Sequence, residues 1–223
     1  MVALVLKVIT HASSSKGNMF EVERGNDTII IDAGVKKDLT ADILAITHAH
    51  GDHSKYIGFY IERVKKVTTS LEVLESLSLK LDGYTFSKIQ EKYTIPEFEN
   101  METLTMAHDL PCVGFLIFDA TKTYMHVTDT TQLEYEPVME IDLLSIEANH
   151  DIDMLMQSNR PEELKQRIIT NGHLSNEKAR EIVDKIKPKQ VNLIHISNQA
   201  NSESCIEKAF KNIEYKIKGS FLL

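Results

Sequence analysis

The sequence predicts an α+β protein in which two β-sheets pack together and helices cover their outer surfaces, within one domain over residues 1–223. Short segments with strand character dominate the N-terminal half, whereas the C-terminal half alternates strands and helices. No linker, low-complexity tract or internal repeat divides the chain. Hydrophobic residues make up 42% of the sequence and charged residues 26%, which is typical of a soluble globular protein with one sizeable core.

The N-terminal half contains two predicted hairpins and two predicted helices. The turn around Gly25 separates two β-rich runs, and residues 119–122 separate another two, as expected for antiparallel pairs. Helical spacing of apolar positions predicts the two helices. The predicted strands are 2–9, 19–23, 28–32, 43–46, 113–118 and 123–128, and the predicted helices are 54–63 and 70–80.

The C-terminal half is predicted as strand and helix in alternation. Pro161 and Ser175 are residue types that favour helix starts, and Pro188 ends the helix before it. The predicted elements are strand 141–146, helices 161–169 and 175–187, strand 190–195, helix 202–211 and a last strand near 213–218.

Cysteine content and net charge restrict the setting and the partners. Cys112 and Cys205 show no C-x-x-C spacing, so we expect neither a disulfide scaffold nor a thiolate zinc site. The expected location is a reducing cytoplasm, which would be that of the host if the protein is viral. The net charge of −8 opposes attraction of DNA or RNA unless a local basic surface compensates. No apolar run has membrane-spanning length, and the first residues lack the features of a signal peptide, so no membrane association is expected.

A dense group of metal-ligand residue types follows the strand predicted over 43–46. His48, His50, Asp52 and His53 lie within the seven residues from Thr47 to His53. Imidazoles and a carboxylate at this density suit a transition metal, and the trailing Asp-His pair suits a second ion nearby. The alternative is a solvated histidine loop, but similarly placed ligands recur downstream. The sequence therefore predicts a two-metal hydrolase.

The downstream candidates follow predicted strands, where strands of one sheet edge converge. They are His108, Asp129 and His195, and Asp32 upstream is placed to support the metal loop through hydrogen bonds. The alternative for either histidine is a buried ring bonded to the backbone, and the alternative for Asp129 is a turn carboxylate.

By these motifs the chain resembles the metallo-β-lactamase-fold hydrolases over nearly its whole length. The matching residues, in order, are Asp32, His48, His50, Asp52, His53, His108, Asp129 and His195. The resemblance implies a four-layer αββα sandwich. It also implies one ion on His48, His50 and His108, a second on Asp52, His53 and His195, and Asp129 bridging both. The histidine-rich set favours Zn²⁺, with Mn²⁺ as the alternative because of the two aspartates.

Further segments resemble the YycJ/WalJ branch of this family, whose members hydrolyse phosphodiesters. They are residues 13–18, 147–151, 170–176 and 195–202. The branch resemblance implies a homodimer, and the viral anti-Pycsar proteins, which degrade cyclic pyrimidine mononucleotides, resemble the same branch.

Three other branches fit less well. β-Lactamases usually carry a different residue at the position of Asp129. Glyoxalase-type relatives have Gly-His-Thr where this chain has Ala107-His108-Asp109. Only about twenty residues separate His108 from Asp129, too few for the protruding arm of the transfer-RNA 3′-processing relatives.

Two metals can clamp the attacking and leaving oxygens at phosphorus, so phosphodiester hydrolysis is the expected reaction. The acidic chain favours a small anionic nucleotide, and the preferred hypothesis is a cyclic-mononucleotide phosphodiesterase with which a virus removes a host immune signal. The alternative is a WalJ-like DNA exonuclease, which would make nucleic acid the partner. A third hypothesis, a non-catalytic nucleotide-binding protein, is disfavoured by the intact ligand set.

The candidate catalytic residues are Asp52, His173 and Glu147. His173 is a non-ligand histidine whose interval to His195 matches that of the proton-donating histidine in the transfer-RNA processing relatives, so it is the candidate general acid. The alternative is that His173 has no catalytic role and simply belongs to the start of the helix that Ser175 caps. Glu147 and His150 are candidates for orienting His173 or contacting substrate, with loop closure as the alternative.

Overall fold

The structure is a computed structural model that describes residues 6–136 and 138–223. Within these residues the strands form a seven-stranded sheet of order β13-β1-β2-β3-β4-β5-β6 and a six-stranded sheet of order β12-β11-β10-β9-β8-β7. The first sheet contains β1 (Leu6–Ala12), β2 (Met19–Arg24), β3 (Asp27–Ile31), β4 (Ala41–Ala45), β5 (Val64–Thr68), β6 (Tyr93–Thr94) and β13 (Ser220–Leu222). The second contains β7 (Met101–Thr105), β8 (Val113–Phe118), β9 (Thr123–Val127), β10 (Leu143–Glu147), β11 (Gln190–Ile194) and β12 (Tyr215–Ile217).

Each sheet combines an antiparallel and a parallel part. Strands β13, β1, β2 and β3 pair antiparallel, as do β7, β8 and β9. Strands β3 to β6 pair parallel in the first sheet, and β9 to β12 do so in the second. Because parallel strands run in one direction, the loops that follow them leave from the same edge of the sheet. Residues at those carboxyl ends can therefore meet in one place.

The two sheets share a core, and strand β8 shows how it forms. Phe115 and Ile117 belong to a buried cluster that also contains Val8 and Val22 of the first sheet. Leu116, between them, belongs to a second cluster with Val183 of the outer helix α7 (Asn176–Ile186). Successive side chains of a strand point to opposite faces, so β8 contacts the other sheet on one side and a helix on the other.

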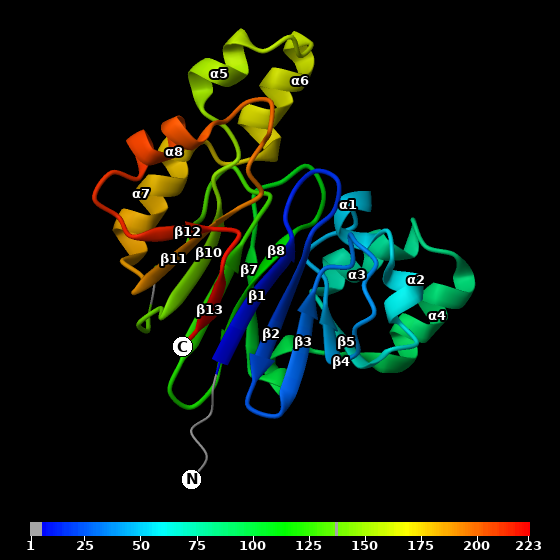
Figure 1. Ribbon diagram of the computed structural model, residues 1–223. Coiled ribbons are helices and arrows are strands. Elements are labelled where there is room, and N and C mark those ends of the chain that lie inside the picture. The colour runs from blue at the N-terminus through cyan, green and yellow to red at the C-terminus, as the bar shows by residue number, and fades with distance from the viewer. Residues whose placement is uncertain (1–5, 137) are drawn as a thin grey trace.

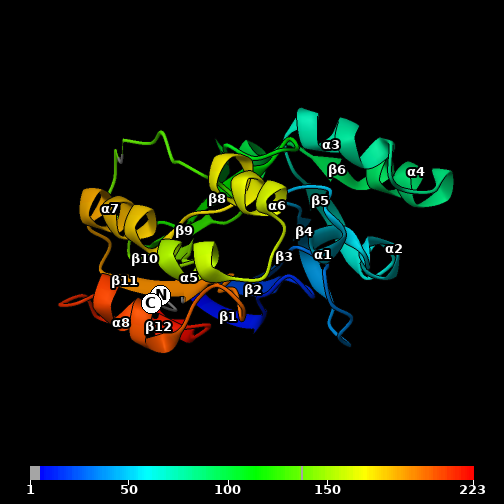
Figure 2. The ribbon, with the colours of Figure 1, turned by 90° about the horizontal axis from the view of Figure 1, so that it is seen from above.

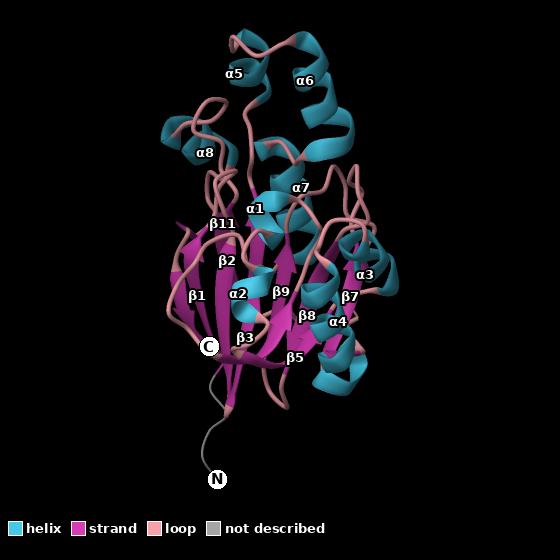
Figure 3. Ribbon diagram, turned by 90° about the vertical axis from the view of Figure 1, so that its right-hand side faces the viewer, coloured by secondary structure: helices cyan, strands magenta, loops and turns pink. Residues whose placement is uncertain are grey.

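The helices are α1 (Gly51–Ser54), α2 (Ile57–Tyr60), α3 (Leu71–Ser78), α4 (Gly83–Lys92), α5 (Ile152–Gln157), α6 (Glu162–Arg167), α7 (Asn176–Ile186) and α8 (Glu203–Ala209), with a 3₁₀ turn at Pro96–Glu99 and a π-helical turn at Ile168–Gly172. Viewed from above, α2 to α4 lie on one side of the strands and α7 and α8 on the other (Figure 2). This arrangement confirms the predicted α+β class and αββα sandwich. Helices α5 and α6 stand beyond the ends of the strands (Figures 1 and 3). None of the helices in the described residues has the length and apolar character needed to cross a bilayer.

Several predicted elements differ in extent. Residues 2–5 of the first predicted strand lie outside the described residues, and β1 continues to Ala12. The helix predicted over 54–63 is instead the pair of short helices α1 and α2, which a turn separates. The helix that follows Ser175 is as predicted, since the Ser175 side chain accepts a hydrogen bond from the Lys178 amide.

Other elements were not predicted at all. They are β5, β6, α4, α5 and β13. In β5 two exposed lysines, Lys65 and Lys66, lie between the buried Val64 and Val67, so the segment lacks the regular alternation of apolar and polar residues that predicts a strand. Strands β6 and β13 are too short to show a pattern of their own.

Candidate metal centre

The predicted ligands lie on loops that leave the carboxyl ends of strands in both sheets. His48 and His50 follow β4, and Asp52 and His53 belong to the short helix α1 directly after them. His108, Asp129 and His195 follow β7, β9 and β11. The structure brings all seven side chains together, in overlapping groups whose potential ligand atoms lie within 4.8 Å of one another.

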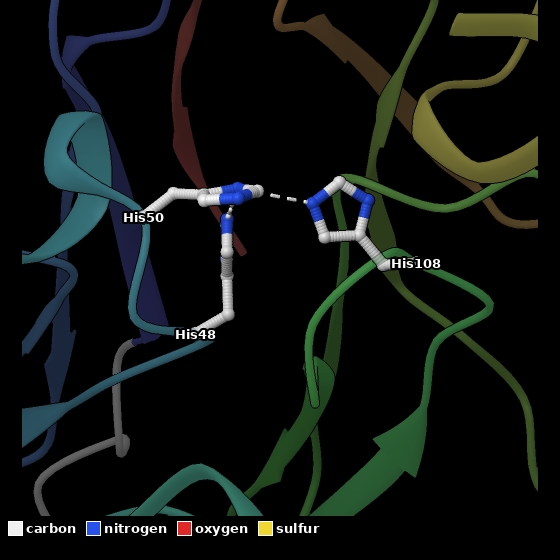
Figure 4. Close-up of side chains that lie close together, drawn as sticks. All are labelled: His48, His50 and His108. Carbon is white, nitrogen blue, oxygen red and sulfur yellow. Dashed lines mark hydrogen bonds between the residues drawn. The ribbon is translucent and has the colours of Figure 1, made fainter. Parts of the chain in front are cut away.

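The first group contains three histidine nitrogens. Nδ1 of His50 lies 3.1 Å from Nε2 of His48 and 3.2 Å from Nε2 of His108 (Figure 4). Burial lowers the pKa of His48 well below its usual value, and the neighbouring His53 lowers it further. A neutral imidazole is the form that binds a metal, so the three rings suit one transition-metal ion.

The second group is Asp52, His53 and His195. Oδ2 of Asp52 lies 3.5 Å from Nε2 of His53 and 3.7 Å from Nε2 of His195. Nε2 of His195 is buried and has no hydrogen-bond partner among the described residues. A buried, unbonded nitrogen beside a carboxylate fits a divalent cation, which would bind it and neutralise the acid.

Asp129 lies between the two groups. Its Oδ2 is 3.2 Å from Nε2 of His53, and its Oδ1 is 3.6 Å from Nδ1 of His195. Asp129 also forms a potential ligand group with His48 and His53. The bridging role that the sequence resemblance implies stays a prediction for this position.

Three of these loop residues have a left-handed backbone. The φ angles are 64° at Asp32, 49° at Asp129 and 49° at His195. A residue other than glycine seldom adopts this conformation, which costs on the order of 1 kcal/mol and persists where surrounding contacts hold it. Each of the three directly follows a strand or lies within two residues of its end, so the strain occurs where the chain turns into the site.

Asp32 has the supporting role that the sequence predicts. Its carboxylate accepts hydrogen bonds from the backbone N–H and the hydroxyl of Thr47 at 2.9 Å, and it lies 2.6 Å from Nδ1 of His53. The carboxylate thus fixes the start of the metal loop and the orientation of the His53 ring.

Other supporting contacts were not predicted. The hydroxyl of Ser13 accepts a 2.6 Å hydrogen bond from the amide of His195, and the side-chain amide of Asn149 donates to the carbonyl of His195 at 2.8 Å. The side-chain amide of Asn18 donates to Oδ2 of Asp52 at 3.2 Å. Both Ser13 and Asn18 fall in the branch-like segment 13–18, which was the only sequence signal for them.

The buried acids and bases shift one another's pKa. Burial alone lowers the pKa of His195, but Asp129, Asp52 and Glu147 outweigh it and raise that pKa to about 10. Burial likewise opposes the charged form of His53, yet Asp32 and Asp129 raise its pKa well above the usual value. Both imidazoles are therefore protonated at neutral pH when only these carboxylates surround them.

His173 and Glu147 also lie at this centre. Nδ1 of His173 is 3.0 Å from Oε2 of Glu147 and 3.2 Å from Oδ1 of Asp129. The other oxygen of Glu147 accepts hydrogen bonds from the amides of Thr130 at 2.9 Å and Leu174 at 3.0 Å. Glu147 therefore contacts the candidate acid and holds two loops.

His150 does not share this position. Its ring is buried, and neither ring nitrogen has a hydrogen-bond partner among residues 6–136 and 138–223. Its carbonyl accepts a 2.8 Å hydrogen bond from the amide of Asn176, so the backbone at His150 closes the loop before α7. The loop-closing alternative describes what His150 does in this structure.

A cavity of about 340 Å³ opens over the candidate ligands. Its lining includes His50, Asp52, Asp129, His173 and His195. Asp109, Arg160 and Arg167 also line it, and none of these three was a candidate site residue in the sequence. Cavities of a few hundred cubic ångströms are the usual size for small-molecule sites.

The fold and this site define a metallo-β-lactamase-fold hydrolase. The chain belongs to the beta-lactamase superfamily, because residues 32–196 match the beta-lactamase superfamily domain. Two bacterial relatives are similar in sequence. Exodeoxyribonuclease WalJ of Streptococcus pneumoniae is 28% identical over 221 residues, covering 85% of this chain and 81% of that protein. Exodeoxyribonuclease YycJ of Bacillus anthracis is 25% identical over 218 residues, covering 85% and 82%.

A solved structure shows the same fold. The metallo-β-lactamase-fold protein YhfI from Bacillus subtilis superposes with a TM-score of 0.70 and 16% sequence identity, covering 99% of each chain. The similarity therefore extends over both sheets and their helices.

Proposed function

We propose that this protein is a two-metal phosphodiester hydrolase that shortens DNA from its ends. The observation that carries the proposal is the site itself, with two candidate ligand groups and Asp129 between them. The relatives named exodeoxyribonucleases support it, since their alignments cover 85% of this chain. This order reverses the preference drawn from charge alone, because the relatives' names favour DNA over a cyclic nucleotide.

The proposed ligands are those of the sequence resemblance. One ion would be held by His48, His50 and His108. The other would be held by Asp52, His53 and His195, and Asp129 would contact both ions. Zn²⁺ is favoured by the five imidazoles, and Mn²⁺ is the alternative. When bound, two such ions stabilise charge on the phosphoryl oxygens and lower the pKa of water.

His173 is the proposed proton donor to the leaving oxygen. It lines the cavity, and its side chain is 22% exposed, so it can reach a substrate. Its Nδ1 faces Glu147, which leaves Nε2 to give a proton to an alkoxide, a poor leaving group. Glu147 is the positioning residue for that ring, and Asp52 contributes as a ligand at the reacting centre.

A cyclic-mononucleotide phosphodiesterase remains a second candidate, in the form of a viral protein that removes a host signal. Two observations favour it: the small cavity and the net charge of −8, which opposes binding of a long polyanion. The homodimer implied by the branch resemblance belongs to either candidate, and light scattering on the purified protein checks it.

The test is to incubate the purified, metal-loaded protein with linear DNA, with covalently closed circular DNA and with 3′,5′-cyclic mononucleotides. We expect linear DNA to shorten, circular DNA to persist, and His50→Ala or chelation to stop the reaction. Hydrolysis of cyclic mononucleotides alone would replace the proposal with the second candidate. A protein that binds two ions per chain and cleaves none of these phosphodiesters would overturn both.

A further inference from the structure

The helical hairpin of α5 and α6 carries two arginines to the mouth of the cavity. It stands above the carboxyl ends of the strands, apart from the helices that cover the sheets (Figures 1 and 3). Arg160 lies in the turn between α5 and α6, and Arg167 ends α6. Both side chains line the cavity together with His50, His173 and His195.

Arg160 reaches the side of the cavity that carries His195. Its Nη2 donates to the hydroxyl of Ser197 at 3.3 Å and to the side-chain oxygen of Gln199 at 3.2 Å. Both acceptors are neutral, and no ion pair within residues 6–136 and 138–223 involves Arg160. Since a guanidinium stays charged at any ordinary pH, Arg160 presents an uncompensated positive charge to the cavity.

Arg167 reaches the other side, next to His108. Its Nε donates to Oδ2 of Asp109 at 2.9 Å, and Oδ1 of the same carboxylate lies 3.2 Å from Nε2 of His108. Nη2 of Arg167 donates to the same Oδ2, so Nη1 is the guanidinium nitrogen that has no hydrogen-bond partner among the described residues, on a side chain that is 56% exposed. The two arginines therefore flank the candidate metal centre, one beside each ligand group.

We propose that Arg160 and Arg167 bind the phosphate groups on either side of the scissile phosphodiester, so that the cavity takes the end of a single-stranded oligonucleotide. The inference rests on the proposed function, which places the scissile phosphate at the metal centre. A guanidinium binds phosphate through parallel N–H donors, which suits a backbone that must be held in one register. A cyclic mononucleotide has a single phosphate, and that phosphate would bind at the metal centre. It therefore offers these arginines no further phosphate to bind.

The apolar lining between the arginines supports this substrate. Leu164 lies on α6 between them and is 38% exposed, and Ile196 directly follows His195. Neither side chain has a hydrogen-bonding group, but each offers a surface against which a nucleobase can pack. Proteins that bind single strands without sequence preference usually combine phosphate contacts with stacking of bases on aromatic side chains. Here the aliphatic Leu164 and Ile196 would take the place of the aromatic side chains and supply a weaker packing surface.

The test measures binding, not turnover. The probe is a short phosphorothioate-linked oligothymidylate with a phosphate on each end and a fluorescent label on a central base, and its anisotropy is followed with metal-loaded protein at several salt concentrations. We expect Arg160→Gln and Arg167→Gln each to weaken binding roughly tenfold. Each should also reduce the slope of log affinity against log salt by about 0.7, the value for one lost phosphate contact on a single strand.

Two further variants separate phosphate binding from other effects. Arg63→Gln makes the same charge change at the opposite end of β5 from the site, so its affinity and salt slope should stay at the wild-type values. Asp109→Asn removes the partner of Arg167. If Arg167 binds phosphate, this variant should keep or raise the affinity. If Arg167 serves only to hold Asp109, Asp109→Asn and Arg167→Gln should weaken binding alike, and the inference is wrong for Arg167.

The outcomes also separate this inference from the proposed function. Wild-type protein that cleaves DNA while both arginine variants bind the probe with unchanged affinity and salt slope would overturn the inference alone. Wild-type protein that does not bind the probe would overturn it as well. If the protein hydrolyses only 3′,5′-cyclic AMP, and both arginine variants bind that nucleotide like the wild type, both the inference about the arginines and the proposed DNA substrate are wrong.

Discussion

Oε2 of the completely buried Glu147 lies 3.0 Å from Nδ1 of His173. Burial alone raises the pKa of Glu147, but His173 and His195 outweigh it and lower that pKa to about 2, so the carboxylate is charged at neutral pH. A charged acceptor at Nδ1 favours a proton on that nitrogen and fixes the ring, which leaves Nε2 as the nitrogen free to contact a substrate under the proposed function.

The first prediction follows from this contact. His173→Ala should lower the rate on an ordinary phosphodiester by roughly 10²–10⁴, because an alkoxide leaving group benefits from protonation. A nitrophenyl phosphodiester should lose much less, since nitrophenolate leaves without a proton. Steady-state rates on the two substrates check this.

His150→Ala is the control for His173→Ala, because His150 is buried away from the cavity lining and its contribution to the loop is a backbone hydrogen bond. Its rates should change alike on both substrates. If His173→Ala lowers both rates equally, or releases metal, His173 does not donate the proton.

The second prediction concerns Asp32. Asp32→Asn keeps an acceptor for the Thr47 amide but removes the charge beside His53, so metal affinity should fall about 10–100-fold with the fold retained. Competition with a chromophoric chelator measures the affinity, and circular dichroism checks the fold.

The matched control for Asp32 is Asp38→Asn, the same substitution at an exposed residue six positions along the chain. Its metal affinity should equal that of the wild type. An Asp32 variant that binds metal as tightly as this control would show that the carboxylate does not support the site.

The candidate ligand residues could be identified from the sequence because each belongs to a short, recognisable segment. His48 to His53 form one short motif, and His108, Asp129 and His195 each follow a run of strand-forming residues. The carboxyl ends of parallel strands lie at one edge of a sheet, so the positions along the chain led us to expect that these side chains converge at one sheet edge. They do lie close together, but they come from both sheets, because the first four follow β4 of one sheet and the last three follow β7, β9 and β11 of the other.

The residues around the ligands could not be predicted, because their contacts are distant in sequence. Arg167 and Asp109 are 58 residues apart, and Asn18 and Asp52 are 34 apart. An isolated arginine or asparagine in a polar segment has no periodicity that indicates its partner. The position of Arg167 depends on where α5 and α6 stand, and α5 itself was not predicted.

The third prediction is that metal binding releases protons. Ligand nitrogens must be neutral, yet the pKa of His195 is about 10 and that of His53 lies well above the usual value. Near neutral pH, binding at the second group should therefore release at least one proton per chain, from His195, to which His53 would add, and affinity should rise with pH up to about 10. Titration calorimetry of chelator-treated protein in two buffers of different ionisation enthalpy counts the protons. Equal heats in both buffers would contradict this.

The fourth prediction concerns stability far from the site. Asp142, just before β10, has a side chain that is 6% exposed. Its Oδ1 lies 3.1 Å from Nζ of Lys122 and 2.9 Å from Nζ of Lys189, and its Oδ2 accepts a hydrogen bond from the Thr123 amide. Burial alone raises the pKa of Asp142, but the Lys189, Thr123 and Lys122 contacts outweigh it and hold that pKa below 3.8.

A carboxyl group with a lowered pKa stabilises the fold above its unfolded pKa, and this contribution is lost as the pH falls through the folded value. Asp142→Asn keeps an acceptor for Thr123 but loses both ion pairs. Since the lysines are partly exposed, it should lower the free energy of unfolding by about 1–2 kcal/mol at pH 7. The difference from wild type should shrink steadily below about pH 4. Urea unfolding of the chelator-treated proteins at pH 7 and at a pH below about 4 measures this difference in the free energy of unfolding, with Asp38→Asn as the control. A difference that is the same at both pH values would mean that the charge of Asp142 does not stabilise the second sheet where β10 begins.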